Sequence, residues 1–252
     1  MKLTDNTIFI TGGASGIGRG LAEAFHQRGN KVIIGGRRKA LLEEVVAANP
    51  GMDSLVLDVA DPASIDAAAR TLIARYPALN VLINNAGLMP FDDAGGALDD
   101  AVSRTLVDTN LLGPIRLTSA LIEHLKRQPQ ATIIHNTSVL AFVPLAVTAV
   151  YSATKAALHS YAMSQRFMLR DTTVRVQEIA PPWVDTDLIK KSGDPRAMPL
   201  DAFIAETMQG LGQDSEEVIV EAIRGFRANP GPGEYGVFNG FNAEMIANPI
   251  PV

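Results

Sequence analysis

The 252-residue chain contains no cysteine, and this absence excludes several kinds of site at once. Disulfide bonds, thiolate nucleophiles and zinc–thiolate centres all require cysteine. A basic excess is missing too, because the formal net charge is −5. The chain therefore has no positive field with which to attract nucleic acid or an anionic membrane.

Long apolar runs are also absent. No run approaches the ~18 residues of a membrane span, and the opening MKLTDNT leads into a strand-like run without the apolar core of a signal peptide. The four histidines show no ligand-like spacing (His26, His124, His135 and His159). We expect a soluble, cytoplasmic protein without a metal site.

The chain does contain a regular alternation of short β-branched runs with helical patterns. Hydrophobic residues make up 47% of it, which suits one large α/β domain over residues 1–252. Most of the β-branched runs are almost entirely apolar, as in parallel strands buried on both faces. The alternation predicts a single-domain, Rossmann-type doubly wound parallel sheet of order 3-2-1-4-5-6, with a seventh strand as an option. The predicted strands are 7–11, 31–36, 54–59, 81–84, 131–136 and 174–180, and the predicted helices are 18–28, 39–48, 62–75, 105–128 and 150–170.

The C-terminal third has weaker patterns. Residues 187–212 contain Gly, Pro and Met with little periodicity, and we interpret them as a helical flap over the site. The run Asp214-Ser215-Glu216-Glu217 has the form of a helix start with a capping-box carboxylate. The Pro- and Gly-rich tail 229–252 yields no assignment.

The first predicted strand runs into TGGASGIG at residues 11–18. Glycines let such a turn tighten and let the backbone approach a phosphate at the positive end of the following helix. An ordinary strand–helix turn is the alternative. The position after the first strand favours a pyrophosphate site, because a dinucleotide fold requires the loop there.

The end of the second strand indicates which dinucleotide would bind. NAD-binding sites of this type place Asp or Glu at this point to bond the ribose 2′-hydroxyl. This chain has Arg37 and Arg38 instead, and a planar guanidinium suits a 2′-phosphate. We therefore predict NADP(H) in preference to NAD(H), with Arg37 as the main contact and Arg38 as a secondary one. The alternative is a solvated basic helix start.

A third pattern is Tyr151-Ser152-Ala153-Thr154-Lys155 at the start of a predicted helix. Residues four apart share a helix face, so the lysine charge is expected to favour the phenolate and lower the pKa of Tyr151. Ser138, just past the fifth strand, can hold a carbonyl oxygen while the tyrosine protonates it. These side chains together indicate acid–base chemistry at a carbonyl.

With these motifs the sequence resembles the short-chain dehydrogenase/reductase family over nearly all its length to about residue 190. Its N-terminal half is also similar to the branch of DltE-like oxidoreductases. The resemblance rests on TGGASGIG (11–18), Asp58-Val59, NNAG (84–87), Asn110, Ser138, YSATK (151–155) and Pro181–Thr186. It implies Tyr151 as proton donor or acceptor, Ser138 as the group that orients the carbonyl, and Lys155 on the nicotinamide ribose. The cofactor contacts that it implies are Gly12, Ser15, Gly16, Ile17, Gly18, Asp58, Val59, Asn84, Ala86, Gly87, Pro181, Val184 and Thr186.

The helix predicted at 105–128 is interrupted by Asn110-Leu111-Leu112-Gly113-Pro114. Pro114 has no N–H for the carbonyl four residues earlier, which belongs to Asn110. We therefore predict a broken helix with a free Asn110 carbonyl, eased by Gly113. The resemblance implies that this carbonyl holds a water of a proton relay through Lys155, whereas a simple packing kink is the alternative.

The predicted substrate pocket is apolar and suits apolar or aromatic carbonyls. Flap cations are a further candidate, since Lys190, Lys191 and Arg196 could meet a carboxylate or could simply be solvated. We expect a homodimer through the helices at 105–127 and 150–170, with Leu158, Tyr161 and Met163 at the contact, and a tetramer as an option. The predicted pocket residues are Met89, Phe91, Leu140, Phe142, Val143, Leu145, Trp183 and Val184.

Two departures from the family pattern stand out. Pro181-Pro182 replaces the usual Pro-Gly, and the glycine-rich last strand is missing, with Glu234–Asn239 as its only candidate replacement. The leading hypothesis is an NADPH-dependent oxidoreductase that interconverts a carbonyl and an alcohol. The alternatives are a non-catalytic NADP(H)-sensing regulator on the same fold, and an epimerase or dehydratase, which the short chain disfavours.

Overall fold

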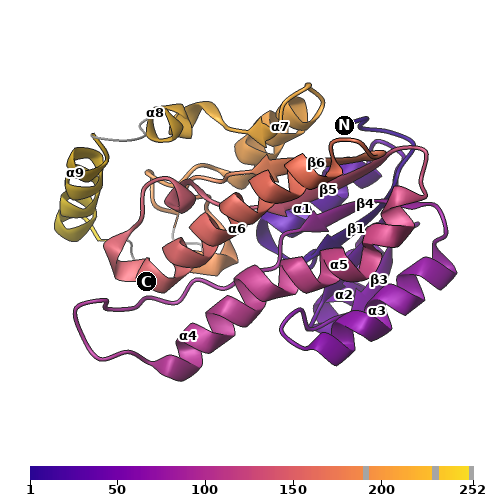
Figure 1. The fold of residues 1–252 in the computed structure, drawn as a ribbon, viewed down its shortest axis with the longest axis horizontal. Helices are drawn as coiled ribbons and strands as arrows, with labels where there is room; N and C mark the ends of the chain where they lie inside the picture. The colour runs from indigo at the N-terminus through magenta and orange to yellow at the C-terminus, as the bar shows by residue number, and fades with distance from the viewer. Residues whose placement is uncertain (190–192, 229–232, 250–252) are drawn as a thin grey trace.

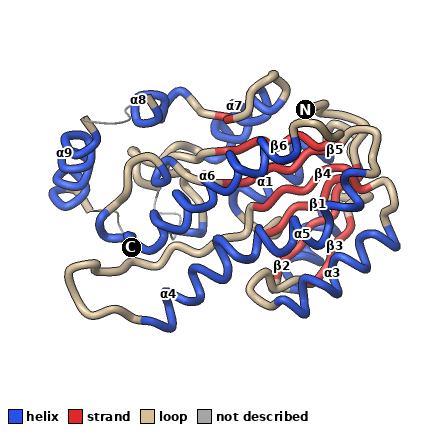
Figure 2. The backbone as a smooth tube through the Cα atoms, in the orientation of Figure 1, coloured by secondary structure: helices blue, strands red, loops and turns tan. Residues whose placement is uncertain are grey.

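The computed structural model describes residues 1–189, 193–228 and 233–249. These residues form one parallel sheet of seven strands in the order β3-β2-β1-β4-β5-β6-β7, with helices on both faces (Figures 1 and 2). The predicted order 3-2-1-4-5-6 is therefore confirmed, and the optional seventh strand is present. The strands are β1 (Thr7–Thr11), β2 (Lys31–Gly36), β3 (Asp53–Val56), β4 (Leu79–Asn84), β5 (Ala131–Asn136), β6 (Val174–Ile179) and β7 (Glu217–Val218).

The helices divide into two layers because alternate strand residues face opposite sides. Ile8 and Ile10 pack on one side with α1, α2 and α7, whereas Phe9 packs on the other with α3, α5 and α6. Within the described ranges, no helix is both long and apolar enough to cross a membrane. The helices are α1 (Gly16–His26), α2 (Lys39–Ala48), α3 (Pro62–Arg75), α4 (Asp100–Val107), α5 (Gly113–Lys126), α6 (Ala149–Leu169), α7 (Leu200–Leu211), α8 (Arg224–Arg227) and α9 (Glu234–Ala247).

The prediction of a broken helix near Asn110 was wrong, because the chain is helical throughout this region. The chain passes from α4 into α5 through a π-helical turn, Asp108–Leu112, and so stays helical. The Gly113 N–H donates to the carbonyl of Asp108. A Cβ on Gly113 would lie 2.7 Å from the carbonyl oxygen of Val59, so glycine is required by close packing against the loop after β3. The wider turn thus accommodates Pro114, which has no N–H to donate.

Two predictions for the C-terminal third were also wrong. The run Asp214–Glu217 does not start a helix but leads into β7, where Glu178 N–H donates to the carbonyl of Glu216 at 2.9 Å. The expected capping carboxylate, Glu217, binds Arg227 instead. The candidate last strand Glu234–Asn239 is the first half of α9, since β7 already occupies the sheet edge next to β6.

The predicted flap contains α7 and a 3₁₀ turn, Asp187–Ile189. Lys190 and Lys191 lie outside the described residues. Of the residues expected at a dimer contact, Leu158 is buried within the fold and is not available to a partner, whereas Met163 is 51% exposed.

Candidate active site

A cleft of about 1330 Å³ lies along the carboxyl ends of the strands, where an open α/β sheet places its ligands. The loops after β1 to β6 line it, and α4, α8 and α9 close its far end. Most of the predicted site residues line this one cleft: Gly12, Ser15, Gly16, Ile17, Arg37, Arg38, Asp58, Val59, Ala86, Gly87, Met89, Ser138, Leu140, Val143, Leu145, Tyr151, Lys155, Pro181, Trp183, Val184 and Thr186.

Four residues predicted to bind cofactor or substrate do not line the cleft: Gly18, which is described below with the glycine loop, Asn84, Phe91 and Phe142. The Asn84 amide donates to Thr118 Oγ1 at 2.9 Å inside the core. Phe91 is 43% exposed on the surface loop after β4. Phe142 packs edge-on against the ring of His159, with ring centroids 5.2 Å apart. Sequence periodicity could not distinguish these positions from their pocket-lining neighbours.

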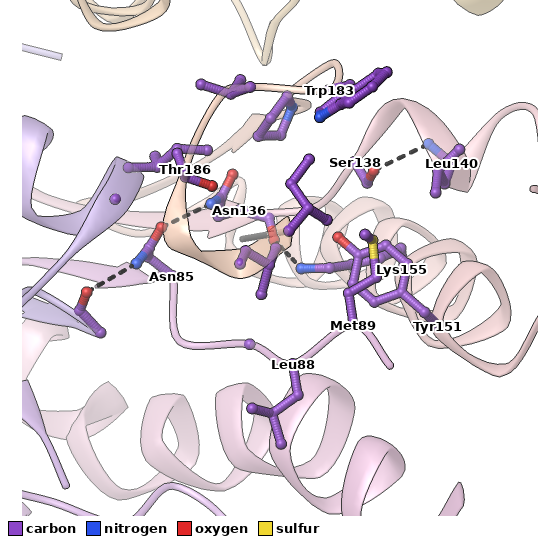
Figure 3. Close-up of a pocket in the computed structure, with 18 of the residues that line it drawn as sticks. Asn85, Leu88, Met89, Asn136, Ser138, Leu140, Tyr151, Lys155, Trp183 and Thr186 are labelled. Atoms are coloured by element: carbon purple, nitrogen blue, oxygen red, sulfur yellow. Dashed lines mark hydrogen bonds between the residues drawn. The ribbon is translucent and has the colours of Figure 1, made fainter. Parts of the chain in front are cut away.

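Asn85 is one of the cleft-lining residues that sequence reasoning missed. Its Nδ2 donates to the carbonyl of Thr11 at 2.9 Å, and its Oδ1 accepts from Asn136 Nδ2 at 2.8 Å. Figure 3 shows the bond between Asn85 and Asn136, with Lys155 on the far side of Asn136. Asn85 therefore joins the loops after β1, β4 and β5. The second asparagine of NNAG was the available signal, because it is the first residue past the strand.

The glycine loop has the geometry of a phosphate cradle. Gly12 and Gly16 have φ of +69° and +52°, which L side chains rarely adopt. Gly18 does not line the cleft but packs beneath the loop, since a Cβ there would lie 2.3 Å from the carbonyl oxygen of Gly12. The helix α1 begins at Gly16, so its amino end faces the cleft. These residues fit the pyrophosphate of a dinucleotide.

Two arginines follow β2 at the rim of the same half of the cleft. Arg37 and Arg38 both line it, and Arg38 Nη2 donates to Ser15 Oγ at 2.7 Å. The cluster offers guanidinium and hydroxyl donors beside the glycine loop, which is a donor set that suits phosphate.

Tyr151 and Lys155 project from the first turns of α6. The carboxylate of Asp92 caps this helix by accepting from the N–H groups of Ala149 and Val150, both at 2.8 Å. Lys155 Nζ donates to the carbonyl of Asn136 at 2.7 Å. The loop after β4 thus fixes the helix that carries the two side chains.

Burial controls the ionisation of both groups. It raises the pKa of Tyr151 to about 12, with the Ser138 hydroxyl acting in the opposite direction. It lowers the pKa of Lys155 to about 8. The prediction that Lys155 lowers the pKa of Tyr151 was therefore wrong for this structure, because the loss of water around the phenol dominates. At neutral pH the phenol is protonated and can donate.

Asn110 is buried behind the cleft and does not line it. Its Oδ1 accepts from the Leu88 N–H at 2.9 Å, and its Nδ2 donates to the Leu88 carbonyl at 2.8 Å. The side chain therefore clamps the loop that follows NNAG. The role of its backbone carbonyl in a water relay stays a prediction.

Two buried polar atoms of cleft-lining residues have no partner among the described residues. They are Asn136 Oδ1 and Trp183 Nε1. Since buried polar groups are nearly always hydrogen-bonded, both atoms are suited to pair with a bound molecule.

A second group of titratable residues joins α6, β6, β7 and α8. His159, Glu178 and Glu217 place ligand-type atoms within 4.8 Å of one another. Arginines already engage both carboxylates: Arg166 Nη2 lies 3.3 Å from Glu178, and Arg227 donates to both oxygens of Glu217 at 2.7 and 2.9 Å. Glu178 raises the pKa of His159. The group is an ion-pair network that fixes α8 to the sheet.

Comparison with known proteins places the chain in a family. The sequence profile of the short chain dehydrogenases matches residues 6–197. The chain is 41% identical over 233 residues to the uncharacterized oxidoreductase DltE of Bacillus subtilis, covering 90% of this chain and 92% of that protein. It is 34% identical over 217 residues to a sulfoacetaldehyde reductase of Chromohalobacter salexigens, covering 83% and 85%. A short chain dehydrogenase from Burkholderia cenocepacia, solved in complex with NADP, superposes over 100% of both chains with a TM-score of 0.81 and 26% identity. The chain therefore belongs to the short-chain dehydrogenase/reductase family of oxidoreductases.

Proposed function

We propose that the protein is an NADPH-dependent oxidoreductase that interconverts a carbonyl and an alcohol. One observation carries this proposal: a protonated phenol, a buried lysine and a serine hydroxyl meet in the same cleft as a glycine cradle and two arginines. A sensor of NADP(H) would need the cradle but not the buried acid–base groups. The NADP complex of the Burkholderia relative supports the choice of a nicotinamide cofactor.

The cofactor, when bound, supplies the hydride to the carbonyl carbon. Tyr151 then gives its phenolic proton to the carbonyl oxygen, which completes the alcohol. Ser138 holds that oxygen by donating a hydrogen bond. Lys155 retains two N–H donors besides the one that binds the Asn136 carbonyl, and its charge stabilises the phenolate until a proton returns from solvent.

Arg37 and Arg38 would hold the 2′-phosphate that distinguishes NADPH from NADH. Arg38 is already positioned by its bond to Ser15. An acidic residue in their place would select the free 2′-hydroxyl of NADH. The arginine pair is thus the basis of the proposed cofactor preference.

The substrate is proposed to be an apolar or aromatic aldehyde or ketone, because the reacting end of the cleft is lined mainly by apolar side chains. The sulfoacetaldehyde reductase relative makes aldehydes the first compounds to test. We also propose a homodimer through α6, where Met163 and Phe167 are exposed on one face.

The test follows NADPH oxidation against a panel of aldehydes and ketones, with NADH and a Tyr151→Phe variant run in parallel. We expect turnover with NADPH, weaker turnover with NADH, and loss of turnover in the variant. Tight NADPH binding without turnover of any carbonyl would instead favour a regulator, and full turnover by Tyr151→Phe would refute the assigned proton donor.

A further inference from the structure

The helix α9 lies in the part of the chain where the family pattern has a glycine-rich strand, and it is tied to the loop before α6. Asn242, in the middle of α9, donates from Nδ2 to the carbonyl of Pro144 at 3.0 Å. Its Oδ1 accepts from the N–H of Ala146. Asn242 is buried, so these bonds are shielded from water. Figure 1 accordingly places α9 beyond the amino end of α6, which carries Tyr151.

A second tie holds the chain that follows α9. Arg196 donates to the carbonyl of Asn248 and, from Nη2, to that of Pro249 at 3.0 Å. The same guanidinium binds both carboxylate oxygens of Asp194, at 3.0 and 2.7 Å. The Cζ atom of Arg196 also lies 5.1 Å from the ring centroid of Trp183. Arg196 is therefore engaged in fastening the C-terminal segment beside the cleft, and the prediction that it meets a substrate carboxylate is not supported by these bonds.

The inward face of α9 completes the apolar end of the cleft. Phe241 and Met245 both line it and pack against the core. The Phe241 ring meets that of Phe226 from α8 at a centroid distance of 5.7 Å. Ile246, on the same helix, is 69% exposed and does not line the cleft.

We propose that α9 is a lid over the substrate end of the cleft, and that Phe241 and Met245 set the length of the apolar carbonyl substrate. The assignment of these two residues as specificity determinants rests on the proposed carbonyl chemistry. The lid itself rests on the bonds of Asn242 and Arg196 and on the position of α9 at the cleft, and it does not depend on the carbonyl chemistry. Removing the Phe241 ring would lengthen the pocket without touching Tyr151 or Lys155.

The lid is tested by the fluorescence of Trp183, because it is the sole tryptophan in the chain and lines the cleft. In Asn242→Ala we expect the emission to shift to longer wavelength and acrylamide quenching to increase, since water reaches the indole. Ile246→Ala is the matched control and should leave both unchanged. Equal quenching in the wild type and Asn242→Ala, with circular dichroism showing folded proteins, would overturn the lid.

The specificity is tested by NADPH-dependent reduction of straight-chain aldehydes from butanal to decanal. In Phe241→Ala we expect the ratio of kcat/KM for decanal to that for butanal to rise about tenfold, the scale of discrimination by a few apolar groups in a pocket. Ile246→Ala should keep the wild-type ratio. An unchanged ratio in Phe241→Ala would overturn its role. A wild type that reduces no carbonyl would overturn the proposed function, and with it the specificity role, while the fluorescence comparison would still decide the lid.

Discussion

Replacing Lys155 with methionine should stabilise the fold at neutral pH while abolishing turnover. Burial lowers the pKa of this lysine from 10.5 to about 8. Each pKa unit corresponds to about 1.4 kcal/mol, so the buried charge costs about 3 kcal/mol of folding free energy below pH 8. Methionine matches the lysine stem but gives up the bond to the Asn136 carbonyl, which costs about 1–2 kcal/mol. The net gain at neutral pH is about 1–2 kcal/mol, or roughly 4 °C in Tm.

The pH dependence of this gain is the decisive quantity. Between pH 8 and 10.5 the unfolded wild type binds more protons at this lysine than the folded wild type does. Wild-type stability therefore rises with pH across this window relative to the variant. The advantage of Lys155→Met should be full below pH 8 and should disappear, or reverse, as the pH approaches 10.5. Tyr151 does not disturb the comparison, because both proteins carry it and its contribution to the pH dependence cancels in the difference between them.

The assay is urea denaturation of both proteins at several pH values, without added cofactor. Lys39→Met is a suitable control, since the Lys39 side chain is 73% exposed and its loss should have little effect on stability at any pH tested. A stability difference between wild type and Lys155→Met that stays constant from neutral pH to pH 10.5 would refute the argument. It would mean that the lysine is not charged at a cost in the folded protein.

Three further predictions test the cofactor half of the cleft and the support of α6. Arg37→Ala should lower the ratio of kcat/KM for NADPH to kcat/KM for NADH by about 10- to 100-fold, the effect expected from losing a charge-assisted hydrogen bond to phosphate. Lys39→Ala is the control and should leave this ratio unchanged, because Lys39 does not line the cleft. Gly18→Ala should weaken NADPH binding and lower Tm, because the new Cβ would lie 2.3 Å from the carbonyl oxygen of Gly12. Gly225→Ala is the control, since nothing lies within 4 Å of that position, and equal effects of the two substitutions would contradict the proposed phosphate cradle. Asp92→Ala should lower stability by about 1 kcal/mol through loss of a helix cap and should lower kcat by displacing the first turn of α6; a fall in stability with unchanged kcat would limit Asp92 to a structural role.

Much of the sheet could be predicted because its signals are local. The bounds of β1, β2 and β5 agree with their predicted ranges, since each is a short apolar or β-branched run with clear ends. The position of β7 could not be predicted in this way. Only Glu217 and Val218 belong to it, and they are extended because they pair with β6, which lies far away in the sequence. An acidic run that would start a helix in isolation is overridden by that pairing and by Arg227.

The candidate site also contains residues whose position local sequence predicts and residues whose position depends on tertiary packing. Asn84 ends β4 inside the core and Asn85 is the first residue beyond it, so the two amides have different surroundings. The predicted strand 81–84 stops at Asn84, as β4 does, but the end of the strand does not by itself show which of the two amides faces the cleft. The same uncertainty separates Leu140, which lines the cleft, from Phe142, which packs against His159. Loop residues can change face within two positions, and only tertiary packing fixes which face each one takes.

The ionisation of the acid–base pair is the property least accessible from spacing. Four-residue spacing puts Tyr151 and Lys155 on one face of α6, and the geometry agrees. Yet spacing carries no information about how much water surrounds the two side chains. Burial raises the pKa of Tyr151 and lowers that of Lys155, and both shifts favour the uncharged form of the side chain. The same cleft also holds Asn136 Oδ1 and Trp183 Nε1, which have no hydrogen-bond partner in the part of the chain that the structure describes. Buried polar groups without a full set of partners weaken the free protein and gain most when a ligand pairs with them. The buried Lys155 ammonium is such a group and is missing from Lys155→Met, so NADPH is expected to raise Tm more in wild type than in the variant.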